Sequence, residues 1–325
     1  MSRGDFVFGP VPSRRFGRSL GVDLVPFKTC PYDCIYCQLG RTTHKTVERR
    51  EWVPLGDVLS EVEARLESDP DYITLSSSGE PTLYSRVGDL IAGIKRMTTV
   101  PVAVLTNGAL LSHPDVRREL READVVAPSL DAPDERLFAW INRPHRSVCY
   151  DEMLHGLTQL RAEYPGRIWL EVFLIAGVTA LNTEAARLAA LAEQIAPDRI
   201  QLNTATRPTA ESYVEAASPE RMQELATLFG ERAEVITDLA QTTRPTGATA
   251  KGAEVRALLA RRPCTATDVA HGLAIHLNEA LKYLGELVER GEAQTVRRGD
   301  RVFFRLCGQP RSAVATSRHQ GGTRQ

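Results

Sequence analysis

The chain has 325 residues, and its 40 lysines and arginines nearly balance 41 aspartates and glutamates. A formal net charge of -1 excludes a general electrostatic attraction to nucleic acid or to an anionic membrane. No segment approaches the roughly 18 apolar residues of a membrane span, and the opening residues lack the apolar stretch of a signal peptide. We therefore expect no membrane partner and a cytoplasmic location, where clustered cysteines indicate metal binding rather than disulfides.

Short apolar segments that end in polar residues recur between residues 15 and 240. They are rich in β-branched residues, as strands buried on both faces are. The six expected strands are 20–25, 73–75, 102–105, 125–126, 169–175 and 200–202. Helical patterns lie between them, for example over 55–66 and 185–195. The alternation predicts an α/β fold with a parallel sheet, either a partial (β/α)6 TIM-like barrel or an open sheet.

A different pattern follows residue 240, so we predict a first domain over 1–240 and a linker over 241–252 that is rich in Thr, Gly and Pro. Three short helices are expected in 253–308, the second with Thr265 as its N-cap. Two extended runs flank the turn RRGD, and this order predicts a small C-terminal winged helix-turn-helix domain. The tail, 309–325, has too little apolar content to pack and is expected to be disordered.

The charges of this second domain leave its role open. The expected recognition helix exposes Glu279, Glu286 and Glu289 against Lys282, which opposes binding to phosphates. The expected wing tip, 297–301, is basic and is a candidate for RNA contact. Capping of the barrel, a protein partner and dimerisation are the alternatives.

Half of the six cysteines lie in one octet, CPYDCIYC, as Cys30, Cys34 and Cys37. A tetrahedral zinc site needs a fourth ligand, and His44 is the nearest candidate. Three thiolates alone suit a [4Fe–4S] cluster whose fourth iron is left open. That iron can chelate S-adenosylmethionine, which one electron from the cluster then cleaves to a 5′-deoxyadenosyl radical.

The pattern Cys30-x-x-x-Cys34-x-Tyr36-Cys37 resembles the signature of the radical S-adenosylmethionine (radical SAM) enzymes. This resemblance covers 15–206 and implies a [4Fe–4S] cluster on the three cysteines, bound S-adenosylmethionine, and an electron donor such as flavodoxin or ferredoxin. The segment GPVPSRRFGRSLGVDLVPFKTCPYDCIYCQLGRTTHK is similar to a subgroup of iron–sulfur oxidoreductases related to wybutosine-base formation on tRNA.

The resemblance also implies contacts to the cofactor at the ends of the strands. Gly79 and Glu80 match a turn that holds the methionyl amino group, although Ser78 replaces its first glycine. The further implied contacts are Thr106 and Asn107, Ser129 and Asp131 at the ribose, Gly177 against adenine and, more weakly, Asn203. For the glycine-containing segments an ordinary turn is the alternative.

Arginines near the first strand, Arg14, Arg15 and Arg18, are candidates for binding a carboxylate or phosphate, with a solvated basic segment as the alternative. Arg143, His145 and Arg146 follow the fourth strand, where we expect His145 to be a structural loop residue. The isolated Cys149, Cys264 and Cys307 are expected to be small buried hydrophobic residues.

The resulting hypothesis is a radical SAM iron–sulfur oxidoreductase that abstracts a substrate hydrogen. Its substrate is a tRNA base, a peptide or a small metabolite. Two other classes stay open at this point: an iron–sulfur redox-sensing winged-helix regulator and a zinc-stabilised scaffold.

Overall fold

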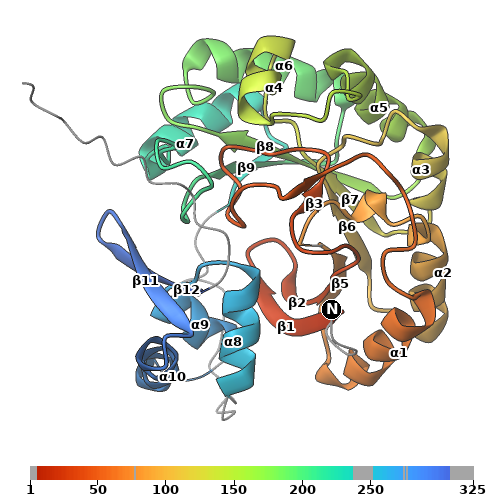
Figure 1. Ribbon diagram of the computed structural model, residues 1–325. Coiled ribbons are helices and arrows are strands. Elements are labelled where there is room, and N and C mark those ends of the chain that lie inside the picture. Colours follow the sequence, from red (N-terminus) through yellow and green to blue (C-terminus); the bar gives the residue numbers. More distant parts are fainter. Residues whose placement is uncertain (1–5, 77, 237–251, 274, 276, 308–325) are drawn as a thin grey trace, which may run out of the picture.

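The computed structural model describes residues 6–76, 78–236, 252–273, 275 and 277–307 (Figure 1). The predicted tail over 309–325 lies outside the described residues, as does the predicted linker except for Gly252, which begins a helix.

One large sheet dominates the first part of the chain. It has eight strands in the order β1-β2-β5-β6-β7-β8-β9-β10, and every neighbouring pair is parallel except β1 with β2. Its strands are β1 (Val7–Ser13), β2 (Gly17–Val22), β5 (Tyr72–Leu75), β6 (Val102–Thr106), β7 (Val125–Pro128), β8 (Arg167–Leu174), β9 (Arg199–Thr204) and β10 (Ala233–Val235). A mostly parallel sheet of this kind agrees with the expected partial barrel.

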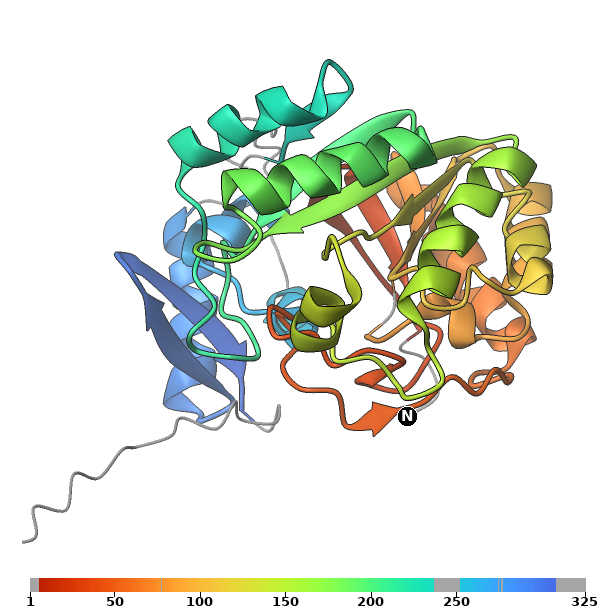
Figure 2. The same ribbon diagram turned by 90° about the horizontal axis from the view of Figure 1, so that it is seen from above.

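Helices connect the strands and lie along the outer side of the curved sheet (Figures 1 and 2). The helices of this part are α1 (Leu55–Arg65), α2 (Val87–Met97), α3 (Pro114–Glu119), α4 (Glu135–Ile141), α5 (Tyr150–Glu163), α6 (Asn182–Ile195) and α7 (Pro219–Ala226). Short 3-10 turns occur at η1 (Leu66–Ser68), η2 (Pro81–Leu83) and η3 (Thr227–Phe229).

Two details of the sheet differ from the prediction. β2 begins three residues earlier than the expected strand 20–25, and β1, which carries two prolines, was not predicted. Proline cannot donate a ladder hydrogen bond, so it is tolerated at a sheet edge, and β1 is the edge strand here. The sheet therefore has more strands than the six expected because strands are added at both ends.

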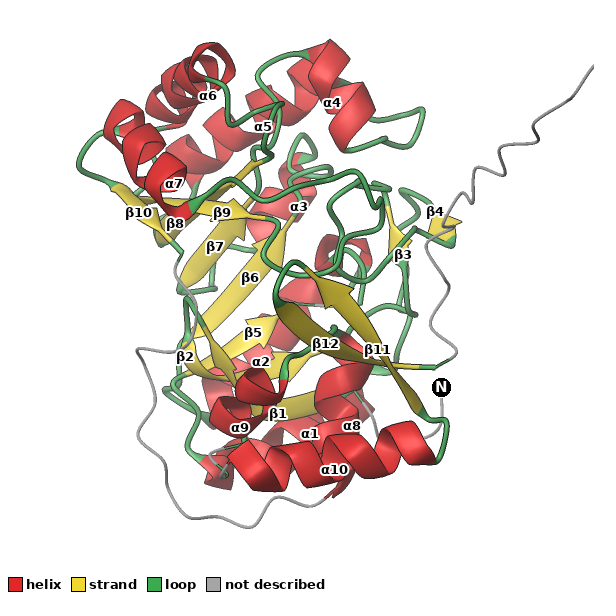
Figure 3. Ribbon diagram, turned by 90° about the vertical axis from the view of Figure 1, so that its left-hand side faces the viewer, coloured by secondary structure: helices red, strands yellow, loops and turns green. Residues whose placement is uncertain are grey.

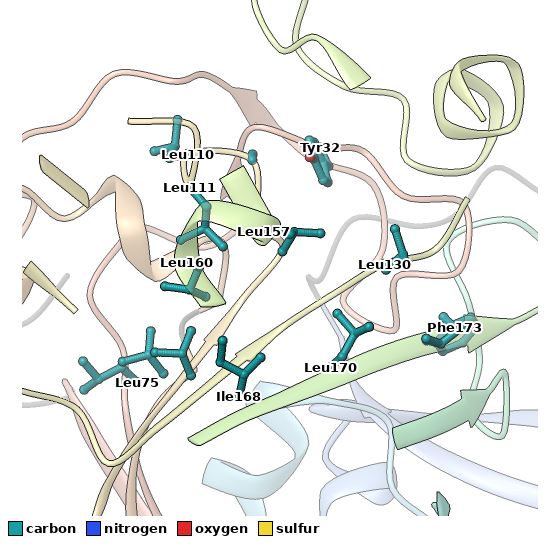
Figure 4. Packing of buried hydrophobic residues seen from close by; sticks show 14 of the residues in the cluster. Tyr32, Leu75, Leu110, Leu111, Leu130, Leu157, Leu160, Ile168, Leu170 and Phe173 are labelled. Carbon is teal, nitrogen blue, oxygen red and sulfur yellow. The ribbon is translucent and has the colours of Figure 1, made fainter. Parts of the chain in front are cut away.

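Side chains on the two faces of the sheet have different environments. In β8, Ile168 and Leu170 belong to the main buried cluster, and Figure 4 shows them below Leu157 and Leu160 of α5. Glu171, one position along, instead lines a cavity. Because successive side chains of a strand point to opposite faces, one face packs on helices and the other forms the interior of the barrel.

An aromatic group fills part of that interior. The ring of Phe16, which is 1% exposed, stacks on Trp169 with ring centroids 5.2 Å apart and meets Tyr72 edge to face. Such pairs add about 0.5–1.5 kcal/mol to the burial of the rings themselves. The segment between β1 and β2 is thereby held inside the barrel.

The C-terminal unit has three helices and an antiparallel hairpin, in the expected order (Figure 3). Its elements are α8 (Gly252–Arg261), α9 (Ala266–Gly272), α10 (Leu277–Glu289), β11 (Ala293–Arg298) and β12 (Arg301–Leu306). The predicted N-cap is confirmed, because Thr265 and Asp268 form a reciprocal capping box. Its identification as a winged helix stays a prediction.

The C-terminal unit lies against the barrel (Figure 2), with α8 and α9 in contact with β1. Arg298 at the end of β11 donates to the carbonyl of Arg207 at 2.8 Å, to Oγ1 of Thr209 at 3.0 Å and to the carbonyl of Val214. This arginine of the expected wing tip therefore binds the first domain. The sequence cannot show that use, because the partners are two carbonyls and one hydroxyl that lie between 84 and 91 residues away.

None of the helices in the described segments is long and apolar enough to cross a membrane.

Candidate functional site

The cysteine octet forms a loop beside the strand ends of the sheet. Cys30 ends the two-residue strand β3 (Thr29–Cys30), which pairs in parallel with β4 (His44–Lys45). The backbone amides of Asp33 and Ile35 donate to carbonyls of Asn142 and Ile141, both at 2.9 Å. The loop is therefore fixed to the end of α4 by hydrogen bonds rather than held by its own residues alone.

Each of the three half-buried thiols has its own side-chain N–H donor. Asn107 donates to Sγ of Cys30 at 3.3 Å and Asn142 to Sγ of Cys34 at 3.5 Å. The Cys37 sulfur accepts from Nζ of Lys28 at 3.1 Å. Hydrogen bonds to the sulfurs are among the features that tune iron–sulfur clusters in proteins.

Cys30 and Cys34 lie in an environment that opposes negative charge when no metal is bound. Burial and the nearby Glu80 carboxylate raise the pKa of Cys30 to about 12, and burial with Asp131 raises the pKa of Cys34 strongly. A coordinated metal deprotonates a thiol and adds positive charge beside these two sulfurs. The three cysteine sulfurs are therefore suited as ligands of a positively charged metal group.

The arrangement fits a cluster better than a single zinc ion. Among the described residues, no three His, Cys, Asp or Glu side chains are close enough to share one metal ion. The ring of His44, the candidate fourth ligand, instead packs edge to face on Trp52 with centroids 5.7 Å apart. A four-iron cube is larger than one ion, so thiols that surround it do not converge on a point.

The SGEP and TNG segments are joined by one buried carboxylate. Oε1 of Glu80 accepts from Oγ1 of Thr106 and from Oγ1 of Thr82, each at 2.6 Å, and Oε2 accepts from the amide of Asn107 at 2.8 Å. Burial raises the pKa of Glu80, although these donors oppose the rise. Glu80 thereby positions Asn107, whose amide side chain contacts Cys30.

Close backbone contact explains the glycine before this carboxylate. A Cβ at position 79 would lie 1.8 Å from the carbonyl oxygen of Thr29, the residue before Cys30. Ser78, which replaces the family's first glycine, is buried and hydrogen-bonds through its amide and hydroxyl to Asp23 at 2.8 and 2.5 Å. The hydroxyl of Ser78 therefore anchors the turn to β2.

Asp131 is buried beside the aromatic residue of the cysteine motif. Its Oδ2 accepts from the hydroxyl of Tyr36 and from Nδ2 of Asn142 at 2.8 Å, and the ring of Tyr36 stacks on Phe173 at 3.9 Å. Burial raises the pKa of Asp131 to about 6, against the effect of both hydrogen bonds. Asn142 links this carboxylate to Cys34, so Asp131 belongs to the surroundings of the thiols.

The remaining predicted contacts lie at the ends of their strands as expected. Ser129 follows β7 and bridges to Glu171 on β8, and its amide donates to Thr106 at 3.1 Å. Gly177 follows β8 with a φ of 69° and nothing within 4 Å of an added Cβ, as in an ordinary bend. Its predicted approach to adenine stays a prediction.

A cavity of about 360 Å³ that is partly open to solvent has Tyr36 and Cys37 in its wall. Arg15 contributes to the lining and forms a 2.7 Å ion pair with Glu171, which also accepts from Asn203 at 2.8 Å. Burial alone would raise the pKa of Glu171, but Arg15 and Asn203 lower it. Asn203, a weak candidate from sequence, thus lines the cavity and orients the half-buried carboxylate of Glu171.

The other candidates take structural positions. Arg18 is exposed and binds the carbonyl of Ser68 at 2.6 Å, away from the cavity lined by Arg14 and Arg15. Arg143 forms a 2.6 Å ion pair with Glu211, while Arg146 is exposed.

The expected role of His145 in its loop is supported by local hydrogen bonds. The amide of His145 donates to the carbonyl of Pro31 at 2.7 Å, and Nδ1 lies 2.8 Å from the Ser147 hydroxyl. The loop after α4 is thereby tied to the cysteine segment.

The prediction for the isolated cysteines is correct at one position and wrong at two. Cys264 is buried, whereas Cys149 and Cys307 are exposed. Cys149 precedes α5 and Cys307 follows β12. The ends of helices and strands lie at the surface more often than their central residues do. An isolated cysteine in a sequence does not show which of these positions it occupies.

Several site residues were missed from sequence. They are polar and belong to no recognisable motif, and all are buried except the half-buried Glu171: Asp23, Lys28, Asn142, Glu171 and Arg207. A lone acid inside WLEVFLI was a usable signal for Glu171, because a charge in a buried strand needs a partner. The others acquire their neighbours only through the fold.

Comparison with known proteins agrees with this site. The family model described as "Radical SAM superfamily" matches residues 24–189. The chain is 35% identical over 228 residues to "UPF0026 protein MJ1312" of Methanocaldococcus jannaschii, covering 69% of this chain and 71% of that protein. It is 34% identical over 305 residues to "UPF0026 protein" of Helicobacter pylori strain 26695, covering 92% and 96%.

A further relative is matched over only part of its length. The protein named "GTPase Obg" of Brachyspira hyodysenteriae is 37% identical over 289 residues, which is 87% of this chain and 42% of that protein. The chain thus spans less than half of that relative, so the name describes that protein and carries no activity over to this one.

Solved structures share the fold at low sequence identity. The radical SAM methyltransferase from Sphaerobacter thermophilus superposes with a TM-score of 0.52 at 20% identity, over 67% of this chain and 66% of that one. SuiB of Streptococcus suis has a TM-score of 0.51 at 14% identity, over 69% and 51%.

The chain belongs to the radical SAM superfamily. The radical SAM domain of this chain binds a [4Fe–4S] cluster and S-adenosylmethionine, as the sequence predicted. The narrower relation to wybutosine-base formation stays a prediction.

Proposed function

We propose that this chain is an enzyme that cleaves S-adenosylmethionine reductively and removes a hydrogen atom from a substrate in the cavity beside Cys37. The observation that carries the proposal is the set of three thiols, each with its own N–H donor, next to the Glu80 network. When bound, the cluster supplies the electron that splits S-adenosylmethionine into methionine and a 5′-deoxyadenosyl radical.

The residues of the chain hold and orient the reactants in this proposal. Cys30, Cys34 and Cys37 bind the cluster. Gly79 permits the close approach of the turn to the Thr29 carbonyl. Glu80 fixes Thr106 and Asn107 and would hold the methionyl amino group. The ribose contacts are Ser129 and Asp131, and Gly177 lies near adenine.

The substrate in this proposal is an organic molecule that binds in the cavity. A tRNA base, a peptide and a small metabolite were the candidates from sequence. The use of Arg298 within the chain removes one cation from the basic hairpin that an RNA would contact. A flavodoxin or ferredoxin as electron donor and a cytoplasmic location, where thiols stay reduced, complete the proposal.

The same use of Arg298 weakens the regulator hypothesis, in which the C-terminal unit reads DNA. In addition, α10 carries the half-buried Glu279 and the exposed Glu289, and acidic side chains oppose the counterion release on which DNA affinity depends.

The test uses the full chain, reconstituted anaerobically with iron and sulfide. With dithionite and S-adenosylmethionine we expect 5′-deoxyadenosine and methionine, measured by chromatography and mass spectrometry. Cys34→Ala should abolish both products, whereas Cys149→Ala, at an exposed cysteine outside the site, should not. Undiminished product formation by the Cys34→Ala protein would refute the proposal.

A further inference from the structure

Arginines from three distant segments meet in the wall of the cavity beside Cys37. Arg14 and Arg15 precede β2, Arg207 follows β9, and Arg261 and Arg262 lie at the end of α8. Guanidinium groups bind phosphate and carboxylate oxygens with two parallel N–H bonds. Among the described lining residues, one carboxylate, that of Glu171, accompanies these five cations.

The charges of the wall leave a positive excess. Arg15 is paired with Glu171, and Arg261 with Asp23 just behind the wall. Asp268 of α9 lies 3.8 Å from Arg207. Asp23 and Asp268 do not line the cavity but contact its arginines. When they are counted with Glu171, the described residues hold five guanidinium groups and three carboxylates, which is an excess of two positive charges.

Arg207 shows most directly that this wall is built for a ligand. It is 8% exposed, and its buried Nε has no hydrogen-bond partner in the part of the chain that the structure describes. Burial, Arg262 and Arg14 lower the pKa of Arg207 to about 9, so it is still charged at neutral pH. A buried cation with an open N–H beside like charges is costly, and a bound anion would remove that cost.

Arg298, which does not line the cavity, also fixes the position of Arg207. Its carbonyl accepts from Arg298, which binds Thr209 and Val214 of the same segment. Leu258, Arg261 and Arg262 of the C-terminal unit complete the wall, so α8 closes the cavity that the barrel begins. The C-terminal unit therefore shapes the ligand site.

The size and charge of the cavity select among anions. Its volume of about 360 Å³ lies at the small end of the range for small-molecule sites. A phosphomonoester carries about -1.5 to -2 charges at neutral pH, which matches the excess of the wall, whereas each phosphodiester of an RNA chain carries about one negative charge. Of the residues that the sequence assigned to S-adenosylmethionine, the weak candidate Asn203 lies in the described lining, and Gly79, Glu80, Thr106, Asn107, Ser129, Asp131 and Gly177 do not.

We infer that this cavity binds a small phosphomonoester as the substrate, with the phosphate on Arg207, Arg262 and Arg14 and the rest of the molecule toward Tyr36 and Cys37. That the ligand is the substrate rests on the proposed function, while the binding of a phosphate rests on the cavity alone.

Binding is measured with the reconstituted full chain by anaerobic isothermal titration calorimetry. The probe is ribose 5-phosphate, compared at equal ionic strength with ribose, malonate and unfractionated tRNA. We expect ribose 5-phosphate to bind, ribose to show no measurable heat and malonate to bind more weakly. Binding of ribose equal to that of its phosphate, preference for malonate, or binding of tRNA alone would each overturn the inference.

Two variants test the arginines separately. Arg262→Gln should weaken ribose 5-phosphate about tenfold or more, because a hydrogen-bonded charge is lost, and Arg207→Lys should weaken it less because it keeps the charge. Arg290→Gln is the control. Arg290 directly follows α10, its side chain is 65% exposed and it does not line the cavity, so this variant should bind as the parent does. Unchanged affinity in Arg262→Gln would contradict the assignment even if Arg207→Lys fails to fold.

The same preparation separates this inference from the proposed function. Release of 5′-deoxyadenosine without any phosphate binding would overturn the inference and leave the proposed function standing. Arginine-dependent phosphate binding without 5′-deoxyadenosine would support the cavity assignment and contradict the proposed function.

Discussion

The two parts of the candidate site, the cysteine loop and the arginine-lined wall, are built in different ways. The three thiols lie within eight residues of one another, whereas the arginines come from segments separated by up to about 250 residues. The sulfurs of the loop accept hydrogen bonds from Lys28, Asn107 and Asn142, which lie outside the octet, whereas the wall holds an excess of cations around a cavity. The chemistry of this protein is thus encoded locally, while the recognition of its substrate is assembled by the fold.

The difference predicts where substitutions act. Changes in the cysteine loop should remove the reaction whatever the substrate. Changes in the arginine wall or in its supports should alter binding and leave the cleavage of S-adenosylmethionine in place.

The largest effect is expected at Gly79. In Gly79→Ala the new Cβ would lie 1.8 Å from the Thr29 carbonyl, so the turn and the strand that carries Cys30 must separate. A displacement near 1 Å in a catalytic arrangement can cost about a hundredfold in rate. We expect that loss in 5′-deoxyadenosine formation, together with less iron and sulfide per chain.

Gly56→Ala in α1 is the matched control, because nothing lies within 4 Å of its added Cβ. It should keep full activity and gain up to about 1 kcal/mol of stability. Equal activity of the two alanine variants would show that the contact with Thr29 is unimportant.

A smaller effect with a defined pH dependence is expected at Asp131. Burial raises the pKa of this carboxyl from 3.8 to about 6, so its ionised form costs the folded state roughly 3 kcal/mol at pH 7. Because the folded pKa is the higher one, this cost is complete above pH 6 and disappears as the pH falls toward 4. Asp131→Asn should therefore stabilise the cluster-free protein at pH 7, and the gain should shrink on acidification.

Thermal unfolding of the parent and Asp131→Asn proteins between pH 7 and 4 measures this difference. Asp300→Asn, at an exposed turn, serves as the control and should leave the Tm unchanged at each pH. A gain that stays constant with pH would show that the charge of Asp131 is not its origin. Lower activity in the more stable variant would identify Asp131 as a residue kept for function.

The smallest of these effects concerns the link between the two parts. Arg298→Ala removes the hydrogen bonds to Arg207, Thr209 and Val214 and should cost about 1–3 kcal/mol of docking energy. We expect faster limited proteolysis between the barrel and the C-terminal unit and weaker binding of ribose 5-phosphate. Cleavage of S-adenosylmethionine without substrate should be unchanged.

Arg297→Ala provides the comparison, because Arg297 is the exposed neighbour on the same strand. If both variants bind ribose 5-phosphate equally well, the C-terminal unit does not position Arg207. The hydrogen bonds from Arg298 would then serve stability alone.

Much of the fold was predictable because its signals are local. Apolar segments of β-branched residues predicted the central strands, and Thr265 predicted the start of α9. The edge strand β1 was not predicted, because its prolines oppose a strand assignment and only its edge position makes them acceptable. Burial of Cys149 and Cys307 was predicted wrongly, since their exposure depends on where the neighbouring elements end.

The sequence by itself determined the metal chemistry, because three thiols within one octet can be brought to one cluster by a single short loop. It also determined the order of strands and helices, since periodicity is set by neighbouring residues. Only the tertiary structure decided that Glu80 fixes Asn107, that Arg298 reaches the first domain and that Arg207 and Arg262 face one cavity. Those contacts join residues far apart in the chain, and their free energy exists only once the sheet, the loop and the C-terminal unit have been brought together.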